Sequence, residues 1–230
     1  MLDITPTEWT AILLSLRVAA VATLVATPIG IALAWLLARR DFWGKSLLDA
    51  LVHLPLVLPP VVTGYLLLLT FGRRGAIGAW LADLGIVFAF RWTGAALACG
   101  VMAFPLLVRP IRLSIEAVDR RLEQAAETLG APPWRVFWSV TLPLALPGVL
   151  AGMVLGFAKA IGEFGATITF VSNIPGETQT ISLAIYSLIQ TPDGDAAALR
   201  LVVVSIVIAI AALIGSEWFA RRATRRLHGN

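Results

Sequence analysis

Five long stretches without a charged residue constrain this chain more than any other feature of its sequence. A backbone in lipid has no water to bond with, so a segment that crosses a bilayer must satisfy its own N–H and C=O groups, as an α-helix does. About 20 residues of helix cross the hydrocarbon, at 1.5 Å per residue. The uncharged stretches are long enough, or nearly so, and occupy residues 18–38, 54–71, 92–108, 140–158 and 201–216.

The composition agrees with a protein whose solvent is the bilayer. Hydrophobic residues make up 58% of the 230 residues, charged residues only 14%, and the mean hydropathy is +0.85, which exceeds the range of soluble domains. We therefore predict an all-α, polytopic transmembrane helical bundle that forms a single domain over residues 1–230. With their flanking residues, the predicted spans cover about 10–38, 49–71, 92–113, 140–161 and 199–220.

The distribution of arginine and lysine predicts which ends of the spans face the cytoplasm, because basic residues concentrate in cytoplasmic loops. They follow the first, third and fifth stretches, at Arg39, Arg40, Lys45, Arg112, Arg120, Arg121, Arg135, Arg221, Arg222, Arg225 and Arg226. Arg73 and Arg74 run against the rule, but the count favours an N-terminus outside and a C-terminus inside. The basic excess thus reflects topology, and no nucleic-acid-binding motif accompanies it.

Glycine and proline recur within the predicted spans. Gly148, Gly152 and Gly156 are spaced four residues apart and give the fourth span a face of small residues, which allows close helix packing. Prolines such as Pro28 and Pro105 kink a helix. This pattern fits a moving element and, equally, ordinary packing within the membrane.

Between the third and fourth spans, residues 119–139 predict a cytoplasmic loop that contains an amphipathic helix. Asp119 is its expected N-cap, Gly130 ends it and Pro133 opens a second short helix. Apolar residues at helical spacing form one stripe, Leu122, Ala125, Ala126 and Leu129. Around a contact with another protein we expect a ring of charges, Arg120, Arg121, Glu123 and Glu127. A helix resting on the lipid surface is the alternative.

After the fourth span the sequence becomes more polar and predicts an outside-facing cap over residues 163–198. Residues 168–171 are expected to be extended and residues 181–189 to form a short helix. Turns are expected at 173–176 and 191–194, where glycine and proline cluster.

The cytoplasmic loop resembles the EAA loop of the permease subunits of bacterial ABC importers. The matching residues are Gln124, Ala125, Ala126, Gly130, Val140, Leu142 and Pro143. The family usually has Glu in place of Gln124 and Ile in place of Val140, which puts a salt bridge from position 124 in doubt. The resemblance implies a coupling helix that docks in a cleft of an ATP-binding subunit through Glu123, Gln124, Ala125, Ala126, Glu127, Leu129, Gly130, Pro133 and Trp134.

Four further segments resemble the molybdate permease subunits within that superfamily: 53–62, 71–75, 162–171 and 172–178. The resemblance runs nearly end to end. It implies a permease fold of the type I ABC importers in the bacterial inner membrane, a homodimer of this chain, two ATP-binding cassette subunits and a periplasmic molybdate-binding protein. Sulfate permeases share part of the pattern, so sulfate and tungstate remain alternative substrates.

A pathway for an oxyanion needs dipoles or cations that replace the water around the ion, without binding the ion so tightly that it cannot leave. The stretch after the fourth span offers such donors at Lys159, Gly162, Gly165, Thr167, Thr169, Ser172 and Asn173. Glu163 would repel an anion, so we expect it to pair with Lys159 four residues earlier. The alternative is a structural gate, or a docking surface for the binding protein with contacts at Thr178, Gln179, Asp193 and Asp195.

The chain offers no constellation for chemistry of its own. Gly44 and Lys45 resemble the end of a P-loop, but Arg39 stands where that loop needs glycine. The only histidines are His53 and His228, and no metal cluster or nucleophile–base pair emerges. We therefore expect no catalysis and no cofactor on this chain, with ATP and Mg held by the partner subunit. A self-sufficient channel or secondary transporter is the remaining alternative class, although neither an inverted repeat nor a charged relay is visible.

Overall fold

The computed structural model describes residues 4–228, and this range contains helices and loops without a strand. The predicted all-α class is confirmed. In chain order the helices are α1 (Pro6–Arg39), α2 (Lys45–Val57), α3 (Pro60–Phe71), α4 (Gly78–Asp83), α5 (Trp92–Glu116), α6 (Arg120–Thr128), α7 (Pro133–Val136), the π-helical turn η1 (Phe137–Thr141), α8 (Leu142–Ile161), α9 (Gly165–Val171), α10 (Ile181–Leu188) and α11 (Asp195–His228). Side chains at 213 and 216–228 lie outside the description, and with them the predicted basic cluster at Arg221, Arg222, Arg225 and Arg226, and His228.

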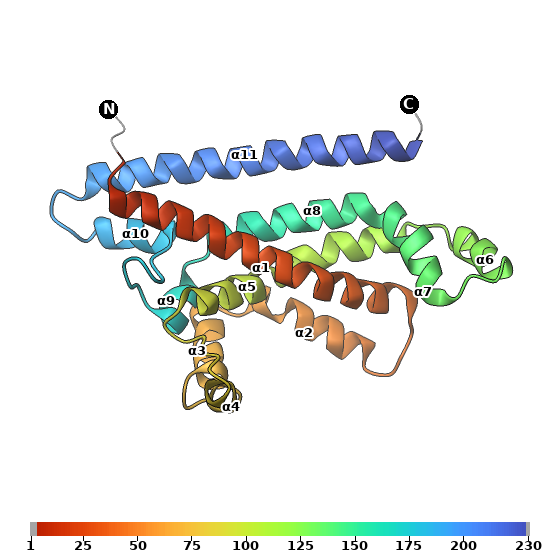
Figure 1. The fold of residues 1–230 in the computed structure, drawn as a ribbon, viewed down its shortest axis with the longest axis horizontal. Coiled ribbons are helices and arrows are strands. Elements are labelled where there is room, and N and C mark those ends of the chain that lie inside the picture. Colours follow the sequence, from red (N-terminus) through yellow and green to blue (C-terminus); the bar gives the residue numbers. More distant parts are fainter. Residues whose placement is uncertain (1–3, 229–230) are drawn as a thin grey trace.

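In the described part of the chain, four helical segments are long and apolar enough to cross a membrane. They are α1, α5, the continuous segment Pro133–Ile161 and the Asp195–Ala212 part of α11. A fifth span results if α2 and α3 count as one. Figure 1 shows α1, α5, α8 and α11 running along the long axis of the molecule. The expectation of about five spans is confirmed as four to five.

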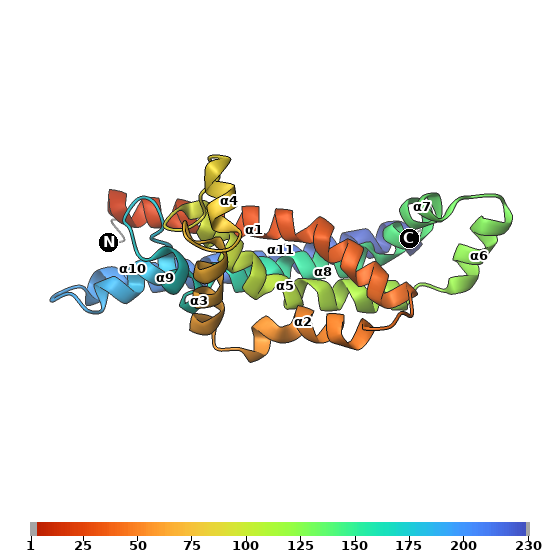
Figure 2. The same ribbon diagram turned by 90° about the horizontal axis from the view of Figure 1, so that it is seen from below.

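The second uncharged stretch does not form one helix. The axes of α2 and α3 meet at 115° across a break of two residues. Leu58 and Pro59 have extended backbone angles because each precedes a proline, which disfavours the helical conformation, and Pro60 then opens α3. Figure 1 shows α3 turned away from the long helices, and Figure 2 shows α2 running beside them. The adjacent prolines turn the expected kink into a break.

The core is centred on α5, which packs between α1 and α8. Cys99, Leu107, Ile111 and Ile115 of α5 are completely buried. The glycine face of α8 lies against this helix: a Cβ at Gly152 would stand within 2.5 Å of the Leu107 carbonyl oxygen. The predicted close packing of the small-residue face is therefore confirmed, and it brings two long helices together with little space between their backbones.

Residues 168–171, expected to be extended, belong to helix α9, so that prediction was wrong. Short apolar runs rich in β-branched residues do not distinguish strand from buried helix. Here Phe170 and Val171 are completely buried in the cluster that also contains α5 residues, and this packing outweighs local propensity. The predicted short helix at 181–189 is confirmed as α10, and Gly176 takes the positive φ that a turn requires.

Polar contacts tie the N-terminal end of α1 to the C-terminal third of the chain. Thr5 and Glu8 form a capping box that starts α1 at Pro6. Glu8, which is 5% exposed, also pairs with Arg200 of α11 at 2.7 Å. The α10 helix is held too, because the backbone N–H of Ile181 donates to the Ser15 hydroxyl at 2.7 Å.

Candidate functional site

The predicted amphipathic helix forms at one end of the bundle, where Figures 1 and 2 show α6 projecting beyond the long helices. The Asp119 carboxylate accepts a hydrogen bond from the Arg121 backbone N–H at 2.9 Å, which caps α6 as expected. Gly130 follows with a φ of +84°, a conformation that favours glycine and lets the chain leave the helix. Pro133 then begins α7 as predicted.

The apolar stripe of α6 points away from the rest of the chain. We use "the α6 stripe" for Leu122, Ala125, Ala126 and Leu129. Leu129 is 89% exposed and Leu122 49%, while no residue of α6 is buried. Exposed Trp134 and Trp138 lie just beyond it. An apolar surface of this kind on a short projecting helix is typical of a protein contact.

Glu123 does not belong to the ring of charges that the sequence predicted. Its carboxylate turns toward the body, where Arg39 of α1 pairs with it at 3.0 Å and the Thr141 hydroxyl donates to it at 2.6 Å. Arg39 also donates to the Val118 carbonyl at 3.1 Å. The two charged side chains are only 9% and 15% exposed. This cluster fastens α6 to the end of α1 and to the beginning of the α8 span.

A charged cleft of about 330 Å³ lies between α6 and the end of α1, beside this cluster. Its lining includes Arg39, Arg40, Arg120, Gln124, Glu127 and Phe137. The charged face of α6 is thus turned toward the body and the α6 stripe toward the exterior. Trp35 of α1 and Phe137 of η1 meet edge to face at 5.9 Å beside the cleft and add an apolar link between these segments.

Two ion pairs organise the neighbouring turn and α2. Lys45 hydrogen-bonds to exposed Asp41 at 2.8 Å and so lowers the pKa of that carboxyl group. Asp49 of α2 pairs with Arg112 of α5 at 2.7 Å. These contacts hold the beginning of α2 at the same end of the bundle as α6.

At the other end of α8, the predicted pair of Lys159 and Glu163 is confirmed. Lys159 Nζ lies 2.6 Å from Glu163 Oε2, and the other carboxylate oxygen accepts from the Ala166 backbone N–H at 3.1 Å. The Glu163 side chain is 1% exposed, whereas that of Lys159 is 30% exposed. We call residues 159–169, which join α8 to α9, "the polar hinge".

The other predicted pathway residues do not converge on one open site. Thr167 and Thr169 donate to the carbonyls of Phe164 and Gly165 within their own helix turn, at 2.8 and 2.9 Å. Gly165 is packed against Pro60, where a Cβ would be 2.7 Å from the proline ring. Gly162 and Ser172 are exposed, while the Asn173 amide donates to Ser187 at 2.5 Å. Lys159 is therefore the partly exposed cation of this set.

Sequence reasoning missed three contacts that position these sites: Arg39 with Glu123, Ser15 with Ile181, and Glu8 with Arg200. Each joins residues far apart in the chain, so no local spacing reveals it. For Glu8 and Arg200, the isolated charge beside an apolar segment was the available signal. Among the side chains that the structure describes, no group of three or more histidine, cysteine or carboxylate residues is arranged to hold a metal ion.

The sequence of this chain is similar to those of known membrane transport proteins. Residues 26–225 match the family described as "binding-protein-dependent transport system inner membrane component". The chain is 61% identical over 224 residues to the molybdenum transport system permease protein ModB of Escherichia coli K12, covering 97% of this chain and 98% of that protein. The Haemophilus influenzae protein of the same name is 58% identical over 221 residues and covers 96% of both chains.

A solved structure shares the fold. It is a chain of the bacterial alginate ABC transporter in complex with an alginate pentasaccharide-bound periplasmic protein, with a TM-score of 0.72 at 20% identity. The match covers 97% of this chain and 80% of that one. At this identity the similarity establishes the arrangement of the helices alone.

Proposed function

This chain belongs to the family of binding-protein-dependent transport system inner membrane components, and we propose that it is the permease subunit of an ATP-driven importer of molybdate. One observation carries the proposal: identities of 61% and 58% to permeases named for molybdenum transport extend over nearly the whole chain. It is an inner-membrane component with several apolar helices, and the transport step rather than covalent chemistry is its role.

Two ATP-binding cassette subunits are proposed to dock at the end that carries α6. The α6 stripe offers two alanines flanked by exposed leucines, which lets a helix backbone approach closely in a partner's groove. Gln124 is neutral and lines the charged cleft, so the contact does not depend on a salt bridge from that position. ATP and Mg belong to the partner in this proposal.

The docking movement would reach the membrane through the cluster of Arg39, Glu123 and Thr141. These residues connect α6 to α1 and to η1, which runs directly into α8. A displacement of α6 by the closing ATP-binding subunits therefore pulls on two long helices together. The break between α2 and α3 and the polar hinge are the points at which such a movement can open the opposite end.

The end with α9 and α10 is proposed to face the periplasm and to receive molybdate from a binding protein. This orientation places the acidic N-terminal segment outside and the C-terminus inside. A second copy of the chain would complete the pathway. Lys159 is the cation we assign to it, and Glu163 at 2.6 Å reduces the attraction for a dianion so that the ion is not trapped.

Uptake of labelled molybdate tests this function. Vesicles holding the chain with its ATP-binding and substrate-binding partners are assayed with and without ATP, and with excess sulfate or tungstate. The proposal expects ATP-dependent uptake that resists sulfate. Uptake without ATP would indicate a channel or secondary carrier, while uptake abolished by modest sulfate or by tungstate alone would assign the chain to another oxyanion.

A further inference from the structure

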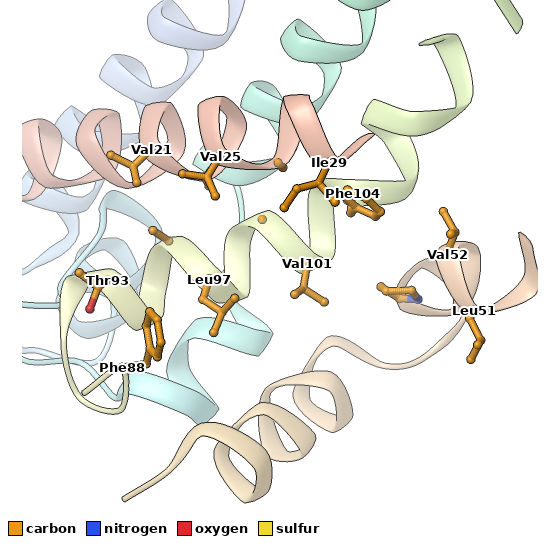
Figure 3. Close-up of a pocket in the computed structure, with 15 residues that line it drawn as sticks. Val21, Val25, Ile29, Leu51, Val52, Phe88, Thr93, Leu97, Val101 and Phe104 are labelled. Carbon is orange, nitrogen blue, oxygen red and sulfur yellow. The ribbon is translucent and has the colours of Figure 1, made fainter. Parts of the chain in front are cut away.

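An apolar groove of about 620 Å³ lies between α1, α2 and α5, within the size range of ligand pockets. Its lining is almost entirely aliphatic and aromatic, and Thr93 is its one hydroxyl-bearing residue. Figure 3 shows Val21, Val25 and Ile29 of α1 along one side and Leu97, Val101 and Phe104 of α5 along another. Leu51 and Val52 of α2 mark one end of the same space.

The other end of the groove is cationic. Arg17 lies four residues, about one helical turn, before Val21 in α1. Residues at this spacing lie on the same face of a helix, so Arg17 follows the line of the groove. Its guanidinium carbon stands 3.7 Å from the centroid of Trp92, the residue next to Thr93. Arg91, the N-cap of α5, is adjacent and exposed. Among the described residues, neither arginine takes part in an ion pair within 4.0 Å.

The spacing of charged residues along α1 and α5 indicates where this cationic end lies relative to the hydrocarbon layer of the membrane. Arg17 and Arg39 lie 22 residues apart in the continuous helix α1, which corresponds to about 33 Å. Arg91, the N-cap of α5, and Arg112 within that helix lie 21 residues apart, or about 31 Å. Both lengths match the hydrocarbon thickness of about 30 Å. Arg17 and Arg91 are therefore at the level of lipid headgroups, and the groove lies at the level of acyl chains.

We propose that this groove binds an anionic phospholipid, with an acyl chain along α1 and α5 and its phosphate held by Arg17 and Arg91. Stacking on Trp92 fixes the guanidinium plane of Arg17 and leaves its edge N–H groups free, which suits bidentate contact with a phosphate. In a bilayer apolar burial does not discriminate between lipids, so the two cations confer the selectivity.

A second copy of this chain is a poorer occupant. A two-fold contact of the groove with itself would bring Arg17 and Arg91 close to the same arginines of the other copy, and like charges at a contact oppose association. An anionic headgroup removes that repulsion. The proposal concerns the groove between α1, α2 and α5 and is independent of which ion the permease carries.

Native mass spectrometry of the full chain, purified with its partners, tests the proposal. The probes are phosphatidylglycerol and phosphatidylcholine with identical acyl chains, and each spectrum also gives the number of protein copies. We expect phosphatidylglycerol to be held at least about tenfold more tightly, as two surface arginines imply. Arg17→Gln should reduce this preference to about threefold or less, and Val25→Trp, which fills the groove from an exposed position, should remove the bound lipid.

The matched control is Arg74→Gln, an exposed arginine outside the groove, which should leave lipid binding unchanged. Equal affinity for the two lipids in the unmodified protein would overturn the proposal. So would loss of a protein copy in Val25→Trp with lipid binding intact, since the groove would then hold a second chain.

Discussion

The two ends of this permease differ in which side chains they expose and which they bury. At the α6 end, apolar side chains are exposed and one carboxylate, Glu123, holds the helix to the body. At the α9–α10 end, Glu163 and Thr167 are buried and their hydrogen bonds are made within the chain. The first arrangement leaves an apolar stripe for another protein, whereas the buried carboxylate of the second fixes the turn between α8 and α9. In the proposed function, α6 receives the force and the polar hinge responds to it.

The largest effect on transport is expected from a charge placed in the α6 stripe. Ala125→Arg puts a long cation where the partner's groove must accept a helix backbone, and should weaken docking of the ATP-binding subunit by about 2 kcal/mol or more, roughly thirtyfold. ATP-dependent uptake should fall to background. Co-purification of the partner gives the affinity change. Thr128→Arg, an exposed position of α6 off the stripe, is the matched control and should retain the partner.

Among the changes that act on the stability of the fold rather than on docking, breaking the ion pair at the polar hinge should have the largest effect. Lys159→Met leaves the buried carboxylate of Glu163 without its cation and should destabilise the chain by about 3 kcal/mol. The double change Lys159→Met with Glu163→Gln should recover most of this stability, because no uncompensated charge remains. Thermal unfolding of the purified protein measures both. Additive losses in the double variant would mean that the two side chains act separately.

At the α6 end, Glu123→Gln tests whether one carboxylate anchors the helix. It removes the charge that Arg39 and Thr141 share and should cost about 2 kcal/mol of local stability. Trypsin should then cleave faster after Arg120 and Arg121. Glu127→Gln, an exposed neighbour on the same helix, should leave the cleavage rate unchanged. Equal rates in both variants would remove the proposed link between α6 and α1.

The smallest effect is expected at the contact between α1 and α10. Ser15→Ala leaves the buried N–H of Ile181 without an acceptor and should cost about 1 kcal/mol. Hydrogen exchange at the Ile181 amide should accelerate, while exchange in α6 stays the same. Acceleration spread over both ends would indicate that the two regions are not separate structural units.

Local patterns in the sequence were enough to predict α6 and the ion pair at the polar hinge. Both depend on local spacings: the i, i+3, i+4 positions of the stripe, and the separation of four positions from Lys159 to Glu163. The inward turn of Glu123 was not predictable, because its partner Arg39 is 84 residues away. The internal hydrogen bonds of Thr167 and Thr169 likewise depend on α9, which the sequence did not predict as a helix.

The proline positions were visible, but their consequence was not. Pro55, Pro59 and Pro60 indicate an interrupted helix, whereas an angle of 115° depends on how α3 packs against α9. Close contact between Gly64 of α3 and the Ala166 backbone forms part of that packing. A local signal therefore locates a break, and tertiary contacts fix its direction.

Protection of a single thiol tests the docking role of the α6 stripe most directly. Cys99 is the chain's only cysteine and is completely buried, so Ala125→Cys introduces one accessible thiol. A maleimide should label it readily in the isolated chain and slowly in the complex with the ATP-binding subunits, while Trp43→Cys, at a fully exposed position, provides the comparison. The account predicts protection at position 125. Equal labelling with and without the partner would contradict it.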